Sequence, residues 1–392
     1  MKTNKLSSFL KWSIVNICRM MLSAALLFSG AVKAIDPRGT EYKIKDYAIA
    51  FGLDDFMVLY LPLVLAIVMA LLEFGLGINL FFGSNRRWTS RVVLILFLAF
   101  TPLTLYLAIE NPVSDCGCFG DYWVLTNWES FAKNVVLLTC AVVVCLAYKL
   151  QTRLITEHNQ WIISTYTWFF GFVLSLYCVY TLPVIDFRPY HIGADLQTKM
   201  QWGDNDEVPP ITDLVITNPQ TGEDLTDSIV LSDGWKFLIV LPHLEHADDG
   251  VMDRLAELTE YCQTHDYTLV ALTASSDSLI EYWRDITGAE YEFLVADEIP
   301  LKTMIRSNPG LILLNGSVVV NKWASTQLPG AEELKAPIPQ LEWMHKKYST
   351  YWDRLVIIMK WYLFPLLLCF VLDRIWFGTV LYRNRKQKKD KL

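Results

Sequence analysis

Two cysteines separated by one glycine, Cys116 and Cys118, are the residues of this sequence best suited to chemistry. Glycine lets the backbone bend sharply, so both thiols can reach one reacting partner or each other. A thiolate is the nucleophile of disulfide exchange, and a strained, exposed disulfide is the labile kind. The pattern indicates thiol redox chemistry. Its alternative is a tight turn whose cysteines form an inert bridge or simply pack.

The cysteine pair lies in a loop between two strongly apolar runs, with Trp123 and Trp128 just after it. The 392 residues are 53% hydrophobic and only 19% charged, and the mean hydropathy is +0.29. Because a bilayer core needs roughly 20 apolar residues in a row, the composition indicates several membrane spans rather than one large soluble core. Six runs have spanning length: 14–34, 56–82, 92–110, 131–148, 161–182 and 355–372.

These runs divide the chain into four segments. Residues 1–182 are expected to form a membrane bundle, 183–211 a linker rich in proline and glycine, 212–350 a soluble domain, and 351–392 a last span with a basic tail. The first run is longer than the apolar core of a typical signal peptide, so we expect it to remain as a span.

Basic residues fix the expected orientation. They follow the second, fourth and sixth runs, and the positive-inside rule places those loops and both termini in the cytoplasm. The cysteine loop and the stretch 183–350 then face outward. This stretch holds 27 acidic and 11 basic residues, which argues against a nucleic-acid partner. Membrane lipid is an expected partner. The basic residues are Arg86, Arg87, Arg91, Lys149, Arg153, Arg383, Arg385, Lys386, Lys388, Lys389 and Lys391.

The outer stretch reads as a small α/β sandwich. Buried-strand patterns occur at 236–241, 267–273 and 292–295, and helical patterns occur at 249–265 and 278–287. Asn315-Gly316 between two apolar runs is a strong hairpin signal.

The first four spans resemble the DoxX/MauE-type membrane proteins over roughly residues 10–150. The resemblance rests on three stretches: Phe28-Ser-Gly-Ala-Val-Lys33 through Asp36-Pro37, Glu73-Phe-Gly-Leu-Gly77, and Asp115-Cys-Gly-Cys-Phe-Gly120. It implies a four-helix bundle, similar in layout to vitamin K epoxide reductases, in the bacterial inner membrane. It also implies work on disulfides in the periplasm, and a quinone is the cofactor we expect if one binds.

The outer stretch looks like a thioredoxin fold. Asn308-Pro309 stands where that fold keeps its cis-proline, so we expect a cis peptide bond there. The place of the active cysteine pair reads Pro242-His243-Leu244-Glu245-His246-Ala247, and Cys262 is the domain's only thiol. This departure from the family pattern predicts a domain that binds a client without thiol chemistry. The expected groove is framed by His243, Leu244, Trp235, Asn308 and Pro309.

Other residues could support the cysteine pair. Ionisable groups in membrane spans are costly and often functional. Lys33 could lower the pKa of a nearby cysteine, or it could extend to the interface. Cys178 could relay electrons, and packing is its alternative. We place Lys33 and Asp36 at the outer surface and Glu73 nearer the inner one. No metal site is expected. The supporting candidates are Lys33, Asp36, Glu73, Asp115, Asp121 and Cys178.

Three functions remain open from the sequence. The first is a membrane thiol-disulfide oxidoreductase that uses Cys116 and Cys118 on an extracytoplasmic thiol partner. The second is a non-catalytic assembly or scaffold protein whose outer domain binds a client. The third is a small-molecule transporter, which we disfavour because the spans show no paired intramembrane charges.

Overall fold

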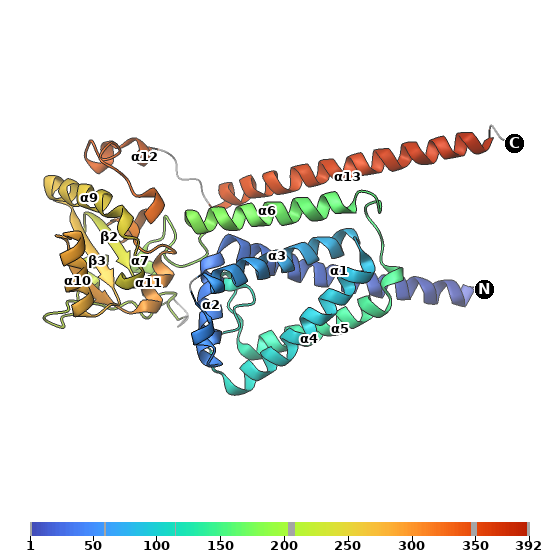
Figure 1. Ribbon diagram of the computed structural model, residues 1–392, viewed down its shortest axis with the longest axis horizontal. Helices are drawn as coiled ribbons and strands as arrows, with labels where there is room; N and C mark the ends of the chain where they lie inside the picture. Colours follow the sequence, from blue (N-terminus) through green and yellow to red (C-terminus); the bar gives the residue numbers. More distant parts are fainter. Residues whose placement is uncertain (1, 59, 114, 203–207, 346–350, 390–392) are drawn as a thin grey trace. The chain divides into compact units, whose positions relative to one another are not determined.

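The computed structural model describes residues 2–58, 60–113, 115–202, 208–345 and 351–389. It divides into two compact units, which we describe separately. The first comprises Met1–Leu176 with Trp352–Leu392, and the second comprises Tyr177–Tyr351. Figure 1 shows the first unit as a set of long helices and the second as a sheet with helices around it.

The first unit holds helices that are long and apolar enough to cross a membrane. The described residues contain six such helices, the number that the sequence predicts for a multi-pass membrane protein. Each lies within a few residues of the predicted run at both ends, except α1, which starts earlier, α4, which starts six residues earlier, and α13, which ends later. They are α1 (Lys2–Ile35), α3 (Leu61–Phe82), α4 (Arg86–Glu110), α5 (Asn127–Leu146), α6 (Gln160–Tyr180) and α13 (Tyr351–Lys389).

Shorter elements connect these helices. The sequence reading missed one of them, the 14-residue helix α2, which Asp36 and Pro37 start. The Asp36 side chain accepts a hydrogen bond from the Gly39 N–H at 2.9 Å, and proline at the first helical position suits the helix geometry. The connecting elements are α2 (Pro37–Ala50) and the 3₁₀ turns η1 (Asp54–Phe56), η2 (Gly120–Tyr122) and η3 (Tyr148–Leu150).

Two glycines let α1 and α3 pack closely. A Cβ atom at Gly30 would lie 2.4 Å from the Phe74 backbone nitrogen, and one at Gly77 would lie 2.8 Å from Leu27. Small residues permit this approach of helix backbones in membrane bundles. The helices run antiparallel at this crossing, because residue 30 meets 74 while residue 27 meets 77. The same register brings Lys33 opposite Glu73.

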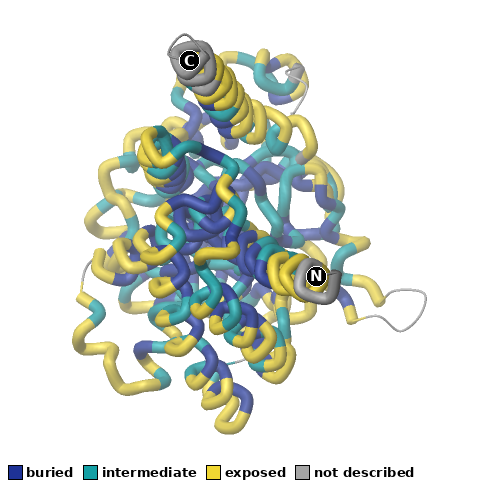
Figure 2. The backbone as a smooth tube through the Cα atoms, turned by 90° about the vertical axis from the view of Figure 1, so that its right-hand side faces the viewer, coloured by how far each residue is buried: buried dark blue, intermediate teal, exposed yellow. Residues whose placement is uncertain are grey.

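Helices α6 and α13 lie side by side (Figure 1). The rings of Tyr166 and Tyr362 stack with centroids 6.0 Å apart, and the Tyr362 hydroxyl lies 3.1 Å from Thr167 Oγ1. Asp373 of α13 accepts hydrogen bonds from the Thr156 N–H at 3.1 Å and from Asn159 Nδ2 at 2.8 Å. Most of the α13 surface is exposed (Figure 2) and apolar, as expected for a helix in contact with lipid.

The second unit is built on a six-stranded mixed sheet in the order β1-β4-β3-β2-β5-β6. Strands β2, β3 and β4 are parallel neighbours, whereas β5 and β6 run antiparallel to the strands beside them. This is the α/β part that the sequence predicts, with every predicted strand present. The strands are β1 (Ile216–Thr217), β2 (Trp235–Leu241), β3 (Thr268–Thr273), β4 (Glu292–Ala296), β5 (Gly310–Asn315) and β6 (Val318–Ala324).

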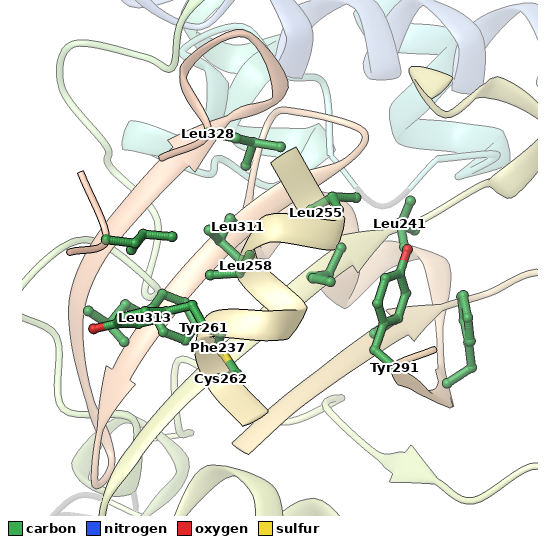
Figure 3. Packing of buried hydrophobic residues seen from close by; sticks show 14 of the residues in the cluster. Phe237, Leu241, Leu255, Leu258, Tyr261, Cys262, Tyr291, Leu311, Leu313 and Leu328 are labelled. Atoms are coloured by element: carbon green, nitrogen blue, oxygen red, sulfur yellow. The ribbon is translucent and has the colours of Figure 1, made fainter. Parts of the chain in front are cut away.

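Both faces of this sheet are covered. Alternate residues of β2 point to opposite faces, so Phe237 and Ile239 pack in one core while Leu238 and Val240 pack in the other. The first core includes Leu258 of α9 and appears in Figure 3. The helices of the unit are α7 (Leu196–Met200), α8 (Thr226–Val230), α9 (Met252–His265), α10 (Asp277–Thr287), α11 (Glu298–Met304) and α12 (Glu342–His345).

The segment 183–211, predicted as a linker, contributes to the second core. Tyr190, Leu196 and Ile211 are buried there. Asp186 lies 2.7 Å from the buried ammonium group of Lys322 on β6, so an ion pair also attaches the segment to the sheet. Proline and glycine in this stretch mark turns within the folded unit.

The Asn308–Pro309 peptide bond is cis, as the resemblance to a thioredoxin fold implies.

Candidate functional site

The cysteine loop follows α4 and bends at Gly117, which has a φ of 61°. Asp115 fixes this bend, because its Oδ1 accepts a hydrogen bond from the Gly117 N–H at 2.8 Å. The Sγ atoms of Cys116 and Cys118 lie 2.7 Å apart, and both thiols are free and half-buried. A left-handed backbone at the intervening residue, which glycine adopts readily, thus brings the two sulfur atoms together.

Lys33 holds the cysteine loop from α1. Its ammonium group donates to Glu73 Oε2 at 2.8 Å, to Ser29 Oγ at 2.6 Å and to the Cys118 carbonyl at 2.9 Å. The Ser29 hydroxyl donates to the same carbonyl at 2.6 Å. Lys33 and Glu73 are each only 3% exposed, so this is a buried ion pair with a hydrogen-bonded loop carbonyl beside it.

Two expectations about Glu73 are therefore wrong. We placed it nearer the inner surface than Lys33, and we found no paired charges within the spans. The two side chains are in direct contact, because the glycine-mediated crossing of α1 and α3 sets Lys33 level with the middle of α3. The reason given for disfavouring a transporter is removed by this finding.

Helix α2 holds the loop from another side. The Tyr47 hydroxyl donates to the Cys116 carbonyl at 2.7 Å, and Lys43 pairs with Asp115 at 2.6 Å. The sequence reading missed both residues. Asp36-Pro37 was the signal that could have found the helix, since an N-capping side chain followed by proline is typical of a helix start.

Lys133 of α5 is the third lysine beside the loop, and the sequence reading missed it too. Its ammonium group lies 4.2 Å from the centroid of the Phe119 ring, in the geometry of a cation–π contact.

A cavity of about 150 Å³ opens beside the two sulfur atoms. Most of its wall is apolar surface, to which Met69 of α3 and Phe100 of α4 contribute. Asn134 of α5 donates to Thr104 Oγ1 of α4 at 3.2 Å, and both residues also line the cavity. Its polar lining residues are Ser29, Lys33, Thr40, Lys43, Tyr47, Glu73, Thr104, Cys116, Cys118, Lys133 and Asn134.

The two thiols have different acidities. The hydrogen bond from the Cys116 thiol lowers the pKa of Cys118 to about 6, although burial opposes this, and the charges of Lys133 and Lys33 act in the lowering direction. Its hydrogen bond to Cys118 and its own burial raise the pKa of Cys116. Burial and the neighbouring cysteine charges raise the pKa of Tyr47, which therefore remains a donor. The raised pKa of Cys116 and the lowered pKa of Cys118 favour Cys118 as the more acidic thiol of the pair.

The other predicted supporting residues do not line the cavity. Asp36 caps α2, and Asp121 lies in η2; neither lines the cavity. Cys178 is buried near the end of α6, in the second unit, and is also absent from the lining residues.

The predicted client-binding residues lie at the end of β2 and before β5. Asn308 Nδ2 donates to the His243 carbonyl at 2.7 Å, and His243 Nε2 lies 2.9 Å from Glu298. Leu244 is 4% exposed within the core and Pro309 is buried, so neither presents a free surface. Trp235 lies at the opposite end of β2, where it pairs with Asn315, and cannot frame the same groove.

The stretch that folds into this site was compared with known proteins. Residues 11–147 match the family model of the methylamine utilisation protein MauE. The MauE-like segment runs from α1 to the end of α5 and contains every residue that lines the cavity. No curated protein and no solved structure matches the chain. The match confirms the MauE part of the resemblance.

Replacing Lys33 by Met in the MauE-like segment should destabilise the bundle. It leaves the buried Glu73 carboxylate without its counter-ion, a loss that costs about 3–5 kcal/mol. The double variant Lys33→Met, Glu73→Met should recover much of the stability, because an apolar pair of similar volume needs no desolvation. The measurement is the thermal unfolding midpoint of the full chain in detergent.

Lys45→Met is the matched control. Its ion pair with Glu41 is partly exposed, so its loss should cost at most about 1 kcal/mol. A double variant as unstable as Lys33→Met alone would contradict the role assigned to the ion pair.

Proposed function

We propose that this protein is a membrane thiol-disulfide oxidoreductase whose reacting groups are Cys116 and Cys118. The observation that carries the proposal is the contact between their two sulfur atoms beside a cavity in the bundle. Four side chains, from Ser29, Lys33, Lys43 and Tyr47, hold the loop by its carbonyls and its aspartate, which leaves both thiols free to react. A merely structural turn would not require this number of contacts.

The exchange conserves atoms and electrons. A thiolate of one protein attacks a disulfide sulfur of the other, forms a mixed disulfide and releases a thiolate. The second cysteine of the attacking pair then displaces the partner sulfur. The Cys116–Cys118 disulfide forms as the partner's disulfide is reduced to two thiols, or the reverse occurs.

The partner is an extracytoplasmic protein with reactive thiols or a disulfide. This part of the proposal rests on the basic residues that follow the second, fourth and sixth apolar runs. By the positive-inside rule they favour a cysteine loop and a second unit that both face outward. A location in a bacterial inner membrane, with the soluble unit in the periplasm, follows from the MauE resemblance. The description of that family suggests an enzyme of methylamine utilisation as one such partner.

A quinone is the cofactor we propose for this site. The residues fit such a group, because most of the cavity wall is apolar surface and the cavity carries donors at Lys133 and Asn134. Aromatic rings such as Phe97 and Phe100 suit a flat ring, and the donors suit its carbonyl oxygens. A bound quinone supplies the capacity to accept two electrons and two protons.

Our second candidate function is the binding of a client protein by the second unit. The alternative of a non-catalytic scaffold protein requires the same binding. Cys262 is the only cysteine described within β1–β6 and the elements between them, and it is buried. The described elements from β1 to β6 therefore hold no cysteine pair for dithiol chemistry. The exposed side of His243, next to Asn308 whose buried Oδ1 atom has no hydrogen-bond partner, favours an extended peptide as the bound client.

The two cysteines should change redox state in intact cells. Intact cells are labelled with a membrane-impermeant maleimide before and after treatment with a reductant. Cys116 and Cys118 should be labelled when they are reduced and should not be labelled when they form a disulfide. Exchange with a model disulfide should fall to background in the variant Cys116→Ser, Cys118→Ser. The buried Cys262→Ser is the matched control and should leave exchange unchanged. A pair that never changes state would favour the scaffold function.

Reporter fusions should report the orientation. Alkaline phosphatase fused after Asp195 should be active, and β-galactosidase fused after Leu392 should be active, because folding of each reporter depends on its compartment. β-Galactosidase activity after Asp195 would overturn the proposed topology.

A photo-crosslinking residue at position 243 should capture a second protein in vivo. The same residue at Glu260, exposed on α9, is the control and should capture much less. Crosslinks from position 243 only to this chain itself would leave the second unit without a client.

A further inference from the structure

Three lysines surround the cysteine loop, and they differ in their partners. Lys33 is paired with Glu73 and Lys43 is paired with Asp115. Lys133 has no carboxylate within ion-pair distance among the residues that the structure describes. Two of the three positive charges are thus neutralised by side chains, and one is not.

Lys33 has no donor left for a sulfur atom. An ammonium group has three N–H donors, and those of Lys33 have three acceptors: Glu73, Ser29 and the Cys118 carbonyl. Its position is therefore fixed by the loop backbone. This assigns Lys33 to holding the loop, and it leaves a direct ion pair with a thiolate to another cation.

Lys133 has the position for that role. It lies within α5, a candidate span, is half-buried and lines the cavity together with Cys116 and Cys118. Its contact with the Phe119 ring directs the ammonium group toward the residue next to Cys118. A lysine in a span is costly unless a negative charge lies close to it.

The sum of charges at the site identifies that negative charge. Three lysines oppose two carboxylates, so the partly buried site carries one excess positive charge when both thiols are protonated. It becomes neutral when one thiol loses its proton. Because a net buried charge is unfavourable, the surroundings favour one thiolate.

We propose that the ammonium group of Lys133 is the counter-ion of the thiolate on Cys118. The proposal deepens the proposed function and rests on it, since it explains which residue makes the cysteine pair reactive at neutral pH. In either direction of exchange, Cys118 is the sulfur atom that carries negative charge, as attacking or as leaving group.

The charged and titratable groups facing Cys118 come from four helices and the loop. The pKa of Cys118 is lowered, in agreement with the charge balance. Helix α4 faces the cavity with uncharged residues only, among the residues described. The facing groups are Lys33 of α1, Lys43 and Tyr47 of α2, Glu73 of α3, Lys133 of α5, and Asp115 and Cys116 of the loop.

The test is the pH profile of alkylation of the full reduced chain in detergent. Iodoacetamide reacts with the thiolate, and mass spectrometry distinguishes Cys118 from Cys116. In the wild-type chain Cys118 should react first and should reach half of its maximal rate near pH 6. Lys133→Met should move this midpoint to higher pH. Because less thiolate is then present, alkylation of Cys118 at pH 7 should be several-fold slower, up to about tenfold.

Lys133→Arg is the matched control, because it keeps the charge and should keep the profile. If Lys133→Met lowers the thermal unfolding midpoint of the chain, the pH profile is measured on Lys133→Gln instead. An unchanged profile in the uncharged variants would overturn the proposal. A profile displaced equally in the Arg variant would also overturn it, because packing would then be the cause. The assay needs no partner protein, so its result is independent of whether exchange occurs in cells.

Discussion

The ammonium group of Lys33 joins three elements that are distant in the sequence. It contacts Ser29 in its own helix α1, Glu73 in α3 and the Cys118 carbonyl in the loop before α5. A buried charge requires a counter-ion and a full set of hydrogen bonds, and this set needs the three elements at fixed distances. The close approach of α1 and α3 through Gly30 and Gly77 supplies the counter-ion, because it sets Glu73 beside Lys33. The bend at Gly117 completes the set of hydrogen bonds, because it turns the Cys118 carbonyl toward the ion pair.

The ion pair also bears on the transporter alternative. Paired charges within spans are common along ion and proton pathways, so their presence in this bundle removes our sequence-based objection. Both charges are nevertheless tied to the loop, since Lys33 bonds to its backbone and Glu73 bonds to Lys33. A pair with this function favours a fixed scaffold for the thiols over a site that must open to alternate sides.

Sequence patterns predicted the architecture better than the site. Long apolar runs and the Asn315-Gly316 hairpin are local signals, so the six spans and all predicted strands are present in the structure. The site depends on contacts between residues up to 89 positions apart, as for Ser29 and Cys118. Periodicity does not encode such contacts. Lys43, Tyr47 and Lys133 look like ordinary polar residues of a loop and a span edge until α2 and α5 are placed around the thiols.

Leu244 shows the same limit in the second unit. Its place directly after a predicted strand suggested a groove, yet the 3₁₀ turn there directs its side chain into the core. The identity of a turn residue does not determine which way its side chain points. That direction follows from the neighbouring helices, and Ser275 fixes it by accepting a hydrogen bond from the Leu244 N–H at 3.0 Å.

The order of the site's residues along the chain has a consequence for biosynthesis. Ser29, Lys33, Lys43, Tyr47 and Glu73 all precede the cysteines, whereas Lys133 follows them. A ribosome adds residues from the N-terminus, so α1, α2 and α3 emerge before the loop. The residues that hold the loop backbone are thus made before the thiols, and the uncompensated lysine is made last. A nascent chain that has reached Phe119 contains its cysteine pair and its holding residues, and it still lacks Lys133.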